Sequence, residues 1–488
     1  ALLRLSIMAA LLLGGAMAPV FAADVKNLSV TVSSGTQANA YGGYTIEEGA
    51  SALQNALTLS GPAKVLGASA GGWSRWGNAE WNTLTIRLDE DGLLGPSDIV
   101  GGGVAESEGG GAAVHNTVYI ESGTVEGTVE GGVAVGINGV GDGTGDVLSN
   151  QVTMSGGTVY SVFGGETGEG NANDNVVTIK GSAAVTGKSN AVYGGYTIDG
   201  NASGNIVNIE DDADIHGEIM GGYTRAGSLI SGNKVNVTGG NVNENTVYGV
   251  YTAYGDVLDN QAVIKGTGQA GSSDTNSVYA GFTNIGAAAG NILYIQDSAE
   301  IAGSAFAGYQ GGFISSETVE RNQVFMSGGS VNGDLTGGGS NNGGETLNNY
   351  VEITGGTVSG NVYSGFTDSA DALENTLTVA GGRVEGSLFG GYSNTGTANE
   401  NKLTFSAGTA GSDAYGGYAQ EGADKNEAVL SGTSVLEGNA AGGSSARGEA
   451  SGNSLTIKEN SEVKGDAAGG DVYMGTISKN IITIQYNA

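Results

Sequence analysis

The sequence predicts an all-β protein: a single elongated parallel β-helix, or β-solenoid, of about sixteen coils with three short strands per coil. Three observations support this prediction. A unit of about 25 to 34 residues recurs sixteen times, and a fixed period in this range is typical of solenoids. Apolar residues in each unit are spaced two apart, which is the strand period. Glycine contributes 92 residues and proline only 3, which indicates repeated turns and excludes collagen.

Residues 1–22 have the pattern of a secretory signal peptide. Arg4 precedes a short apolar run, and Val20-Phe21-Ala22 forms a small-residue end suited to cleavage. The apolar run is too short to span a bilayer. Residues 23–488 are predicted to form one repeat array. Because the chain begins without Met and stops soon after a strand motif, we expect it to be clipped at the N-terminus and truncated at the C-terminus.

The first predicted strand of each coil begins with an asparagine. In the unit at 205–209, Asn205 is followed by Val207 and Ile209, at the second and fourth positions after it. This alternation predicts a strand with one apolar face. The sixteen motif asparagines are Asn55, Asn82, Asn116, Asn150, Asn175, Asn205, Asn233, Asn260, Asn291, Asn322, Asn349, Asn375, Asn401, Asn426, Asn453 and Asn480.

Two further strands complete the predicted coil. The second is short, as at 239–242, and the third runs through an apolar-aromatic pair such as Val192-Tyr193 into a small pair, here Gly194-Gly195. We expect this glycine pair to form a sharp corner with positive φ. A polar loop of varying length then leads to the next asparagine, which predicts a surface loop on a fixed scaffold.

The coils are predicted to stack. One coil of three such strands is not stable alone, so neighbouring coils must supply its hydrogen bonds. Equivalent strands then lie parallel at about 4.8 Å, and sixteen coils give a rod about 75 Å long. Helical alternatives fail because glycine and β-branched residues dominate.

The motif asparagines share the inward parity of the apolar residues, so they are predicted to face in at a corner. Stacked amides would hydrogen bond along the rod and to the turn backbone, which avoids a penalty of about 1 to 3 kcal/mol for each buried unsatisfied amide. A row of ligands or glycosylated asparagines is the alternative. The predicted structural ladder comprises Asn175, Asn205, Asn233, Asn260, Asn291, Asn322, Asn349, Asn375 and Asn401.

Aromatic residues recur just before the small pair. Strand alternation from Val358 to Val362 places Tyr363 on the outer face, and Glu130 occupies the same slot in another unit, which also favours exposure. Two roles remain open: contact with sugar rings or a partner surface, or stacking that stabilises neighbouring strands. The predicted stripe comprises Tyr193, Tyr248, Tyr279, Phe306, Tyr363, Phe389 and Tyr415.

The net charge of −32 is spread along the array. It makes nucleic acid an unlikely partner and fits an extracellular surface that repels its own copies. Absence of cysteine excludes a disulfide scaffold and thiol-ligated metal sites.

Catalytic residues are not evident. His115 and His216 have no partner at ligand spacing, and the acidic groups at 89–91 and 211–214 are isolated occurrences, which are usually solvated. The stretch 141–146 has the Gly and Asp content of a calcium repeat but occurs once, whereas such sites need tandem copies. We therefore expect no enzyme activity, no cofactor and no metal.

The chain resembles the passenger region of bacterial autotransporter adhesins over about residues 24–488. The resemblance rests on the signal peptide, the absence of cysteine, the acidic Gly-, Asn- and Thr-rich array, and repeated motifs such as Val192–Tyr196 (V-Y-G-G-Y) and 355–360 (G-G-T-V-S-G). It implies export across both membranes of a Gram-negative cell and display on the outer membrane as a parallel β-helix. The family's membrane barrel has no counterpart in this chain, so either the sequence is a fragment or the protein is released by another route.

Two classes of function follow. The first is a secreted or surface-displayed structural or adhesive rod whose loops or stripe contact host surfaces, glycans or sister cells. The alternative is a secreted polysaccharide-active β-helix enzyme.

Overall fold

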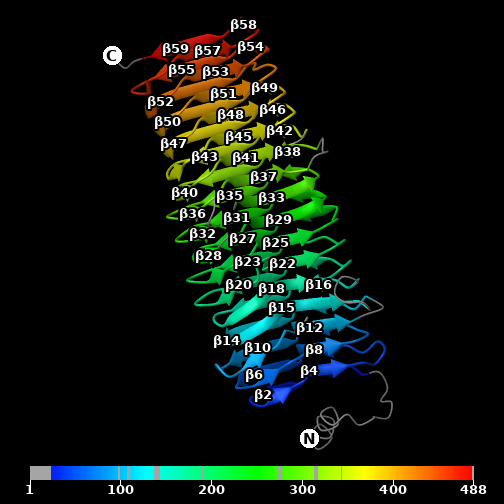
Figure 1. Cartoon of the computed structure of the whole chain (residues 1–488). Helices are drawn as coiled ribbons and strands as arrows, with labels where there is room; N and C mark the ends of the chain where they lie inside the picture. The colour runs from blue at the N-terminus through cyan, green and yellow to red at the C-terminus, as the bar shows by residue number, and fades with distance from the viewer. Residues whose placement is uncertain are drawn as a thin grey trace, which may run out of the picture.

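The chain folds into one continuous parallel β-solenoid of about sixteen coils (Figure 1). The computed structural model describes residues 23–96, 99–106, 110–136, 143–188, 191–242, 245–271, 277–312, 317–341 and 343–485. These residues contain strands, turns and bends but no helix. The predicted fold class is confirmed, and the signal-peptide prediction for residues 1–22 lies outside the described residues.

One coil shows how the units stack. It begins at Asn205 and contains β23 (Ile206–Ile209), β24 (Asp214–Ile215), β25 (Ile219–Thr224) and β26 (Leu229–Ser231). Each strand pairs in parallel with its equivalent four strands later: β27, β28, β29 and β30. Each repeat is therefore one coil.

The strands that follow the repeated corner are β2 (Ser29–Val32), β6 (Ala56–Gly61), β10 (Thr83–Leu88), β14 (Thr117–Ser122), β17 (Gln151–Met154), β20 (Val176–Ile179), β23, β27 (Lys234–Val237), β31 (Gln261–Ile264), β35 (Ile292–Ile295), β39 (Gln323–Met326), β43 (Tyr350–Ile353), β47 (Thr376–Val384), β50 (Lys402–Ala410), β52 (Glu427–Leu436), β55 (Ser454–Lys458) and β59 (Ile481–Gln485). In β47, β50 and β52 the first and second strands of the coil are continuous.

The separate second strands are β3 (Thr36–Gln37), β7 (Lys64–Val65), β11 (Leu93–Leu94), β21 (Ala184–Val185), β24, β28 (Asn241–Val242), β32 (Gln269–Ala270), β36 (Glu300–Ile301), β40 (Ser330–Val331), β44 (Thr357–Val358) and β56 (Glu462–Val463). In β15 (Thr124–Val135) and β18 (Thr158–Glu166) the second and third strands are continuous.

The third strands carry the aromatic residues. They are β4 (Ala40–Thr45), β8 (Ser69–Ser74), β12 (Val100–Glu106), β22 (Val192–Thr197), β25, β29 (Val247–Tyr254), β33 (Val278–Ile285), β37 (Ala305–Gln310), β41 (Leu335–Ser340), β45 (Val362–Thr367), β48 (Leu388–Ser393), β51 (Ala414–Ala419), β53 (Ala440–Ser445) and β57 (Ala467–Val472).

A fourth short strand, which the sequence did not predict, lies within the polar loop. These strands are β1 (Val25–Lys26), β5 (Ala52–Leu53), β9 (Ala79–Glu80), β13 (Ala113–Val114), β16 (Val147–Leu148), β19 (Ala172–Asn173), β26, β30 (Asp256–Leu258), β34 (Ala288–Ala289), β38 (Val319–Glu320), β42 (Thr346–Leu347), β46 (Ala372–Leu373), β49 (Ala398–Asn399), β54 (Glu449–Ser451) and β58 (Thr476–Ser478). They form small separate parallel sheets. Inward apolar side chains of these strands, such as Ile230 and Val257, pack in a separate column that Ala202 of the preceding coil extends. One apolar residue in a polar loop is too short a pattern to predict a strand.

The central core is a set of continuous apolar columns. Val177, Val207 and Val235 stack in register, as do their neighbours two residues later, and all are buried. Each column member is covered by its equivalents on both sides, so the narrow interior is filled by identical contacts repeated along the rod.

Candidate functional site

The motif asparagines form one hydrogen-bonded ladder along the rod. The amide oxygen of Asn205 accepts hydrogen bonds from the backbone N and from Nδ2 of Asn175, both at 3.0 Å. Its own Nδ2 donates to the carbonyl of Ala172 at 2.8 Å and to Oδ1 of Asn233 at 3.0 Å. The same pattern repeats from Asn55 to Asn480.

The structure places all nine asparagines of the predicted ladder inside the rod with their amides bonded in this way. Asn175, Asn205, Asn233, Asn260, Asn291, Asn322, Asn349, Asn375 and Asn401 are at most 1% exposed. Their amides have no free donor or acceptor directed at solvent, which is incompatible with a row of ligands or glycosylation acceptors at these positions.

Positive φ occurs at the residue before each motif asparagine. All sixteen of these residues have φ between 54° and 69°, and they include Gln54, Arg321 and Glu374 as well as Gly232. Only glycine adopts this conformation without strain. The predicted positive φ at the small pair is therefore wrong, since Gly194 and Gly195 are not among the positive-φ residues.

The small pair is instead explained by close approach. A Cβ on Gly194 would collide with the carbonyl oxygen of Gly221 in the next coil, and one on Gly195 would collide with the Asn205 amide. The second glycine of the pair thus makes room for the ladder, so the two most regular features of the repeat depend on each other.

The predicted aromatic stripe is less exposed than expected. Tyr193 is 1% exposed and Phe389 is 8% exposed, and Tyr248, Tyr279, Phe306, Tyr363 and Tyr415 are half-buried. The prediction of an exposed row is wrong because it omitted a second aromatic column beside the first.

The second column comes from the residue after the small pair. It contains Tyr44, Trp73, Tyr196, Tyr223, Tyr251, Phe282, Tyr309, Phe366, Tyr392 and Tyr418. Residues three apart in a regular strand point to opposite faces. In β22 the pairing skips Gly194: Tyr193 pairs with Met220, and Gly195 pairs with Gly222. The first glycine is an irregularity that turns both rings to the outer side, where Tyr193 and Tyr196 pack edge to face at 5.5 Å.

Ring faces within the columns are covered by neighbouring rings. Tyr196 and Tyr223 stack at 4.8 Å with planes 7° apart, and Tyr279 and Phe306 stack at 4.8 Å with planes 8° apart. A sugar binds an aromatic ring through its face, so the interior members of these columns offer only edges and hydroxyl groups. The geometry therefore favours the stabilising role of the stripe and removes ring-face stacking by sugars along most of its length.

The columns are interrupted where small residues replace both rings. Thr336 and Gly339 of β41 stand between the run that ends at Phe306 and Tyr309 and the run that begins at Tyr363 and Phe366. The ring of Tyr309 leans over Gly339 and leaves no room for a Cβ there.

Burial and neighbouring carboxylates raise the pKa of the stripe tyrosines. For Tyr196, burial comes first, followed by Tyr223 and Glu166, and together they raise the pKa to about 12. For Tyr415, burial, Asp413 and Asp471 raise the pKa. These phenols stay neutral at physiological pH and act as hydrogen-bond groups.

Two acidic side chains enter the columns directly before the aromatic run that begins at Phe163 and Tyr196. Glu130 takes the first-column slot below Phe163 and is fully buried, and Glu166 takes the second-column slot in the next coil. Their carboxyl groups hydrogen bond, and burial raises the pKa of Glu166 to about 7. The exposure inferred from Glu130 is thus also wrong, because its side chain is buried, while Glu166 beside it is half-buried.

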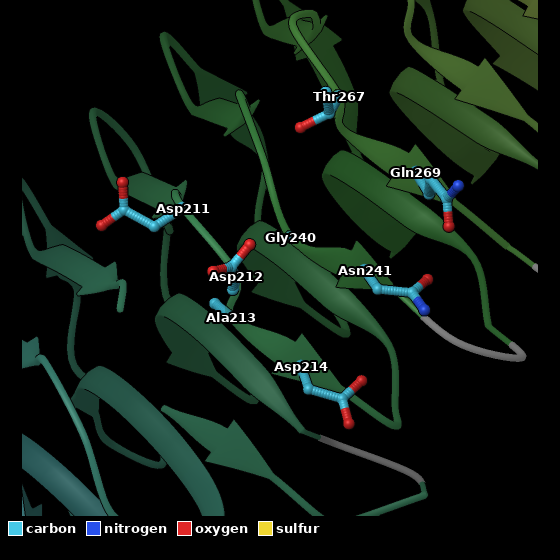
Figure 2. Close-up of a pocket in the computed structure, with 8 residues that line it drawn as sticks. All are labelled: Asp211, Asp212, Ala213, Asp214, Gly240, Asn241, Thr267 and Gln269. Atoms are coloured by element: carbon cyan, nitrogen blue, oxygen red, sulfur yellow. The ribbon is translucent and has the colours of Figure 1, made fainter. Parts of the chain in front are cut away.

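The acidic groups at 89–91 and 211–214 line separate surface hollows. Asp214, Asn241 and Gln269 follow one another from coil to coil along a surface hollow, while Asp211 points away from them (Figure 2). Asp89 and Glu90 lie in a loop beside Arg87, whose guanidinium pairs with Glu121 at 2.7 Å. The carboxylates of Asp211 and Asp214 point in different directions, which does not suit two acids that share one substrate.

The histidines lie on separate surfaces. His216 Nε2 is 3.0 Å from an Asp214 carboxylate oxygen, and the His115 ring packs on Trp81 at 4.2 Å. Among the described residues no three His, Cys, Asp or Glu side chains could hold a metal ion together. Two residues of the calcium-like stretch, Gly141 and Asp142, lie outside the described residues.

Sequence reasoning also missed a shorter polar ladder at the start of the third strands. Asp334 Oδ1 accepts from the Asn361 backbone N at 2.7 Å, and Asn361 Oδ1 accepts from that of Ser387 at 2.9 Å. Asp413 and Asn439 continue the pattern. An Asn or Asp just before the third strand in these coils was the available signal.

Comparison with known proteins returned no family model, no curated protein and no solved structure that matches this chain. In the described part of the chain, no helix is long and apolar enough to cross a membrane.

Proposed function

We propose that this chain is the rod of an exported structural or adhesive protein, displayed on the outer membrane of a Gram-negative bacterium in the manner of autotransporter passengers. The observation that carries the proposal is the continuous stack of about sixteen coils (Figure 1). Such a stack holds one end of a chain at a fixed distance from the other, which suits a stalk or an adhesin more than a soluble catalyst.

Two further features support the proposal. A signal-like segment at residues 1–22 precedes the array. Coil-by-coil pairing also needs only the neighbouring coil as a template, so the rod can fold progressively as it emerges from a membrane. Its possible partners are host surfaces, glycans or sister cells, and the proposal includes no catalytic activity, cofactor or nucleic acid.

Surface labelling tests the export proposal directly. The chain has no cysteine, so a Thr456→Cys variant carries one thiol on the outer face of β55, and Val235→Cys places one in the core as a matched control. Both variants are produced in Gram-negative cells, joined to an outer-membrane barrel. We expect a membrane-impermeant maleimide to label intact cells that carry Thr456→Cys and not Val235→Cys. Labelling of Thr456→Cys only after lysis would contradict display.

An adhesion assay tests the second half of the proposal. Cells that display the rod should bind each other or a host-cell layer more than cells that display the barrel alone. Equal binding by both would leave a structural stalk as the function and remove adhesion. Incubation of the purified rod with a panel of polysaccharides tests the absence of catalysis, and release of shortened products would overturn it.

A further inference from the structure

We infer that one aromatic face of the rod is a docking surface for a lysine- or arginine-bearing polypeptide segment. The face, called the C-terminal aromatic patch, consists of Tyr363, Phe366, Phe389, Tyr392, Tyr415 and Tyr418 on β45, β48 and β51, which follow one another along the rod (Figure 1). The inference rests on the proposed function, because it names the partner chemistry of an adhesive rod.

The patch is rigid and presents ring edges. Tyr363 and Phe389 stack at 5.0 Å with planes 5° apart, and Phe366 and Tyr392 stack at 5.5 Å with planes 11° apart. The next coil continues both stacks, because Tyr415 stacks on Phe389 and Tyr418 stacks on Tyr392. A partner cannot lie on the enclosed ring faces, but it can lie across the half-buried edges as an extended chain.

Four carboxylates border the patch. Asp334 and Asp413 directly precede β41 and β51, Asp471 lies in β57, and Asp368 directly follows β45. The Tyr415 hydroxyl donates to Asp413 at 3.1 Å, and Asp471 occupies the slot of Tyr418 two coils later. Burial is the main cause that raises the pKa of Tyr363, Tyr392 and Tyr415, and the carboxylates add to it: Asp334 acts on Tyr363, Asp368 on Tyr392, and the other two on Tyr415. No Lys or Arg acts on these three tyrosines, and none of the ion pairs in the described residues includes a border carboxylate.

This charge arrangement identifies the partner. The aromatic run nearer the N-terminus has its own cation, because Arg225 pairs with Asp199 at 3.0 Å beside Tyr223. At the C-terminal aromatic patch no described Lys or Arg forms an ion pair with a border carboxylate, so the border attracts cations from outside. A second copy of this chain is disfavoured because both surfaces carry excess negative charge, −32 over the whole molecule.

A lysine or arginine side chain fits both parts of this surface. Its alkyl stem can lie along the ring edges while its charged end meets a border carboxylate. The carboxylates span five coils, or about 24 Å, which an extended peptide of about ten residues covers. Side chains on one face of such a peptide recur at every second residue.

Binding of a synthetic peptide of about ten alternating lysines and serines to the purified rod tests the inference, measured by fluorescence anisotropy at low and at physiological salt. The border variant replaces all four aspartates by asparagine, which keeps the backbone hydrogen bonds that Asp334 and Asp413 accept. The control variant, Glu47→Gln, Glu48→Gln, Asp91→Asn and Asp212→Asn, removes the same charge from exposed loops elsewhere.

We expect the border variant to weaken binding at least about tenfold and the control variant less than about threefold, with affinity falling as salt rises. Equal weakening in both variants would show general attraction to an acidic protein and overturn the inference. Binding of a neutral polysaccharide that the border variant leaves unchanged, without binding of the lysine peptide, would also overturn it. Because the assay uses purified rod, its failure is distinct from a failure of export.

Discussion

At the scale of single residues, the motif asparagine has the central structural role. Its place at a corner followed from sequence alone, because its parity matches that of the apolar residues two and four positions later. The direction of the hydrogen bonds between consecutive asparagines could not be predicted, because the sequence does not indicate which coil donates. In the structure each amide oxygen from Asn82 onward accepts two hydrogen bonds from the preceding coil, as Asn291 does from Asn260.

Replacement of one ladder asparagine tests this role. Asn291→Ala leaves the backbone N of Asn260 and the carbonyl of Val257 without their partners. We expect a loss of about 2 to 4 kcal/mol in the free energy of unfolding, measured from urea midpoints. Asn236→Ala, on the outer face, removes only the hydrogen bond that its Nδ2 donates to Asn208 at 2.7 Å and should cost about 1 kcal/mol or less. Equal effects of the two substitutions would refute a buried ladder.

The positive-φ position could not be predicted, because so many residue types occupy it. Gly232 has φ of 69°, and a Cβ there would meet only ordinary van der Waals contacts with Gly204 at 3.9 Å, so the cost of Gly232→Ala is conformational only. We expect a loss of about 1 kcal/mol. Gly95 has negative φ and room for an ordinary contact, so Gly95→Ala should be neutral or stabilising. A neutral Gly232→Ala would show that the corner relaxes.

At the scale of strands and columns, the first strand of each coil was predictable and the outer face was not. The apolar alternation after each asparagine fixes the inward columns, whereas the aromatic face depends on a local irregularity at Gly194 that no period-two pattern reveals. The exposure of the stripe was therefore misjudged, since parity placed Tyr193 outside but gave no sign that Tyr196 stands beside it.

The acid pair between β15 and β18 should make stability depend on pH. Burial raises the folded-state pKa of Glu166 to about 7, above its unfolded value of about 4.3. Between these two pKa values the folded state holds one more proton than the unfolded state. The contribution of this proton to the free energy of unfolding is complete below the unfolded pKa and disappears as pH rises through the folded pKa.

We expect the urea midpoint of the wild type to fall between pH 5 and pH 8 relative to that of the double variant Glu130→Gln/Glu166→Gln, by the equivalent of about 1 to 3 kcal/mol. The double variant removes the titration of the pair while keeping hydrogen-bonding side chains. Parallel pH profiles for the two proteins would contradict a shared proton in the column.

At the scale of the whole molecule, the rod is a one-dimensional array, so a complete coil should be removable. Deletion of residues 322–348 removes β39, β40, β41 and β42 and joins Arg321 to Asn349, which preserves the ladder. It also removes Thr336 and Gly339, so the two aromatic runs become continuous. We expect a folded rod whose urea midpoint is equal to or above that of the full array.

Deletion of residues 205–232, which joins Gly204 to Asn233 and preserves the ladder, is the control, because it removes one coil from within an uninterrupted aromatic run. It should fold with no gain in stability. If the first deletion unfolds the rod while the second does not, the coils are not interchangeable units.

The central claim is that each repeat is one coil of a continuous rod, and distances along one outer column test it most directly. Thr178, Thr378, Thr404 and Thr456 occupy one column, and the last three lie seven, eight and ten coils from the first. With spin labels on cysteines that replace these threonines in pairs, we expect separations of about 34, 38 and 48 Å by pulsed electron paramagnetic resonance. Separations that do not grow in proportion to the number of coils would contradict the account.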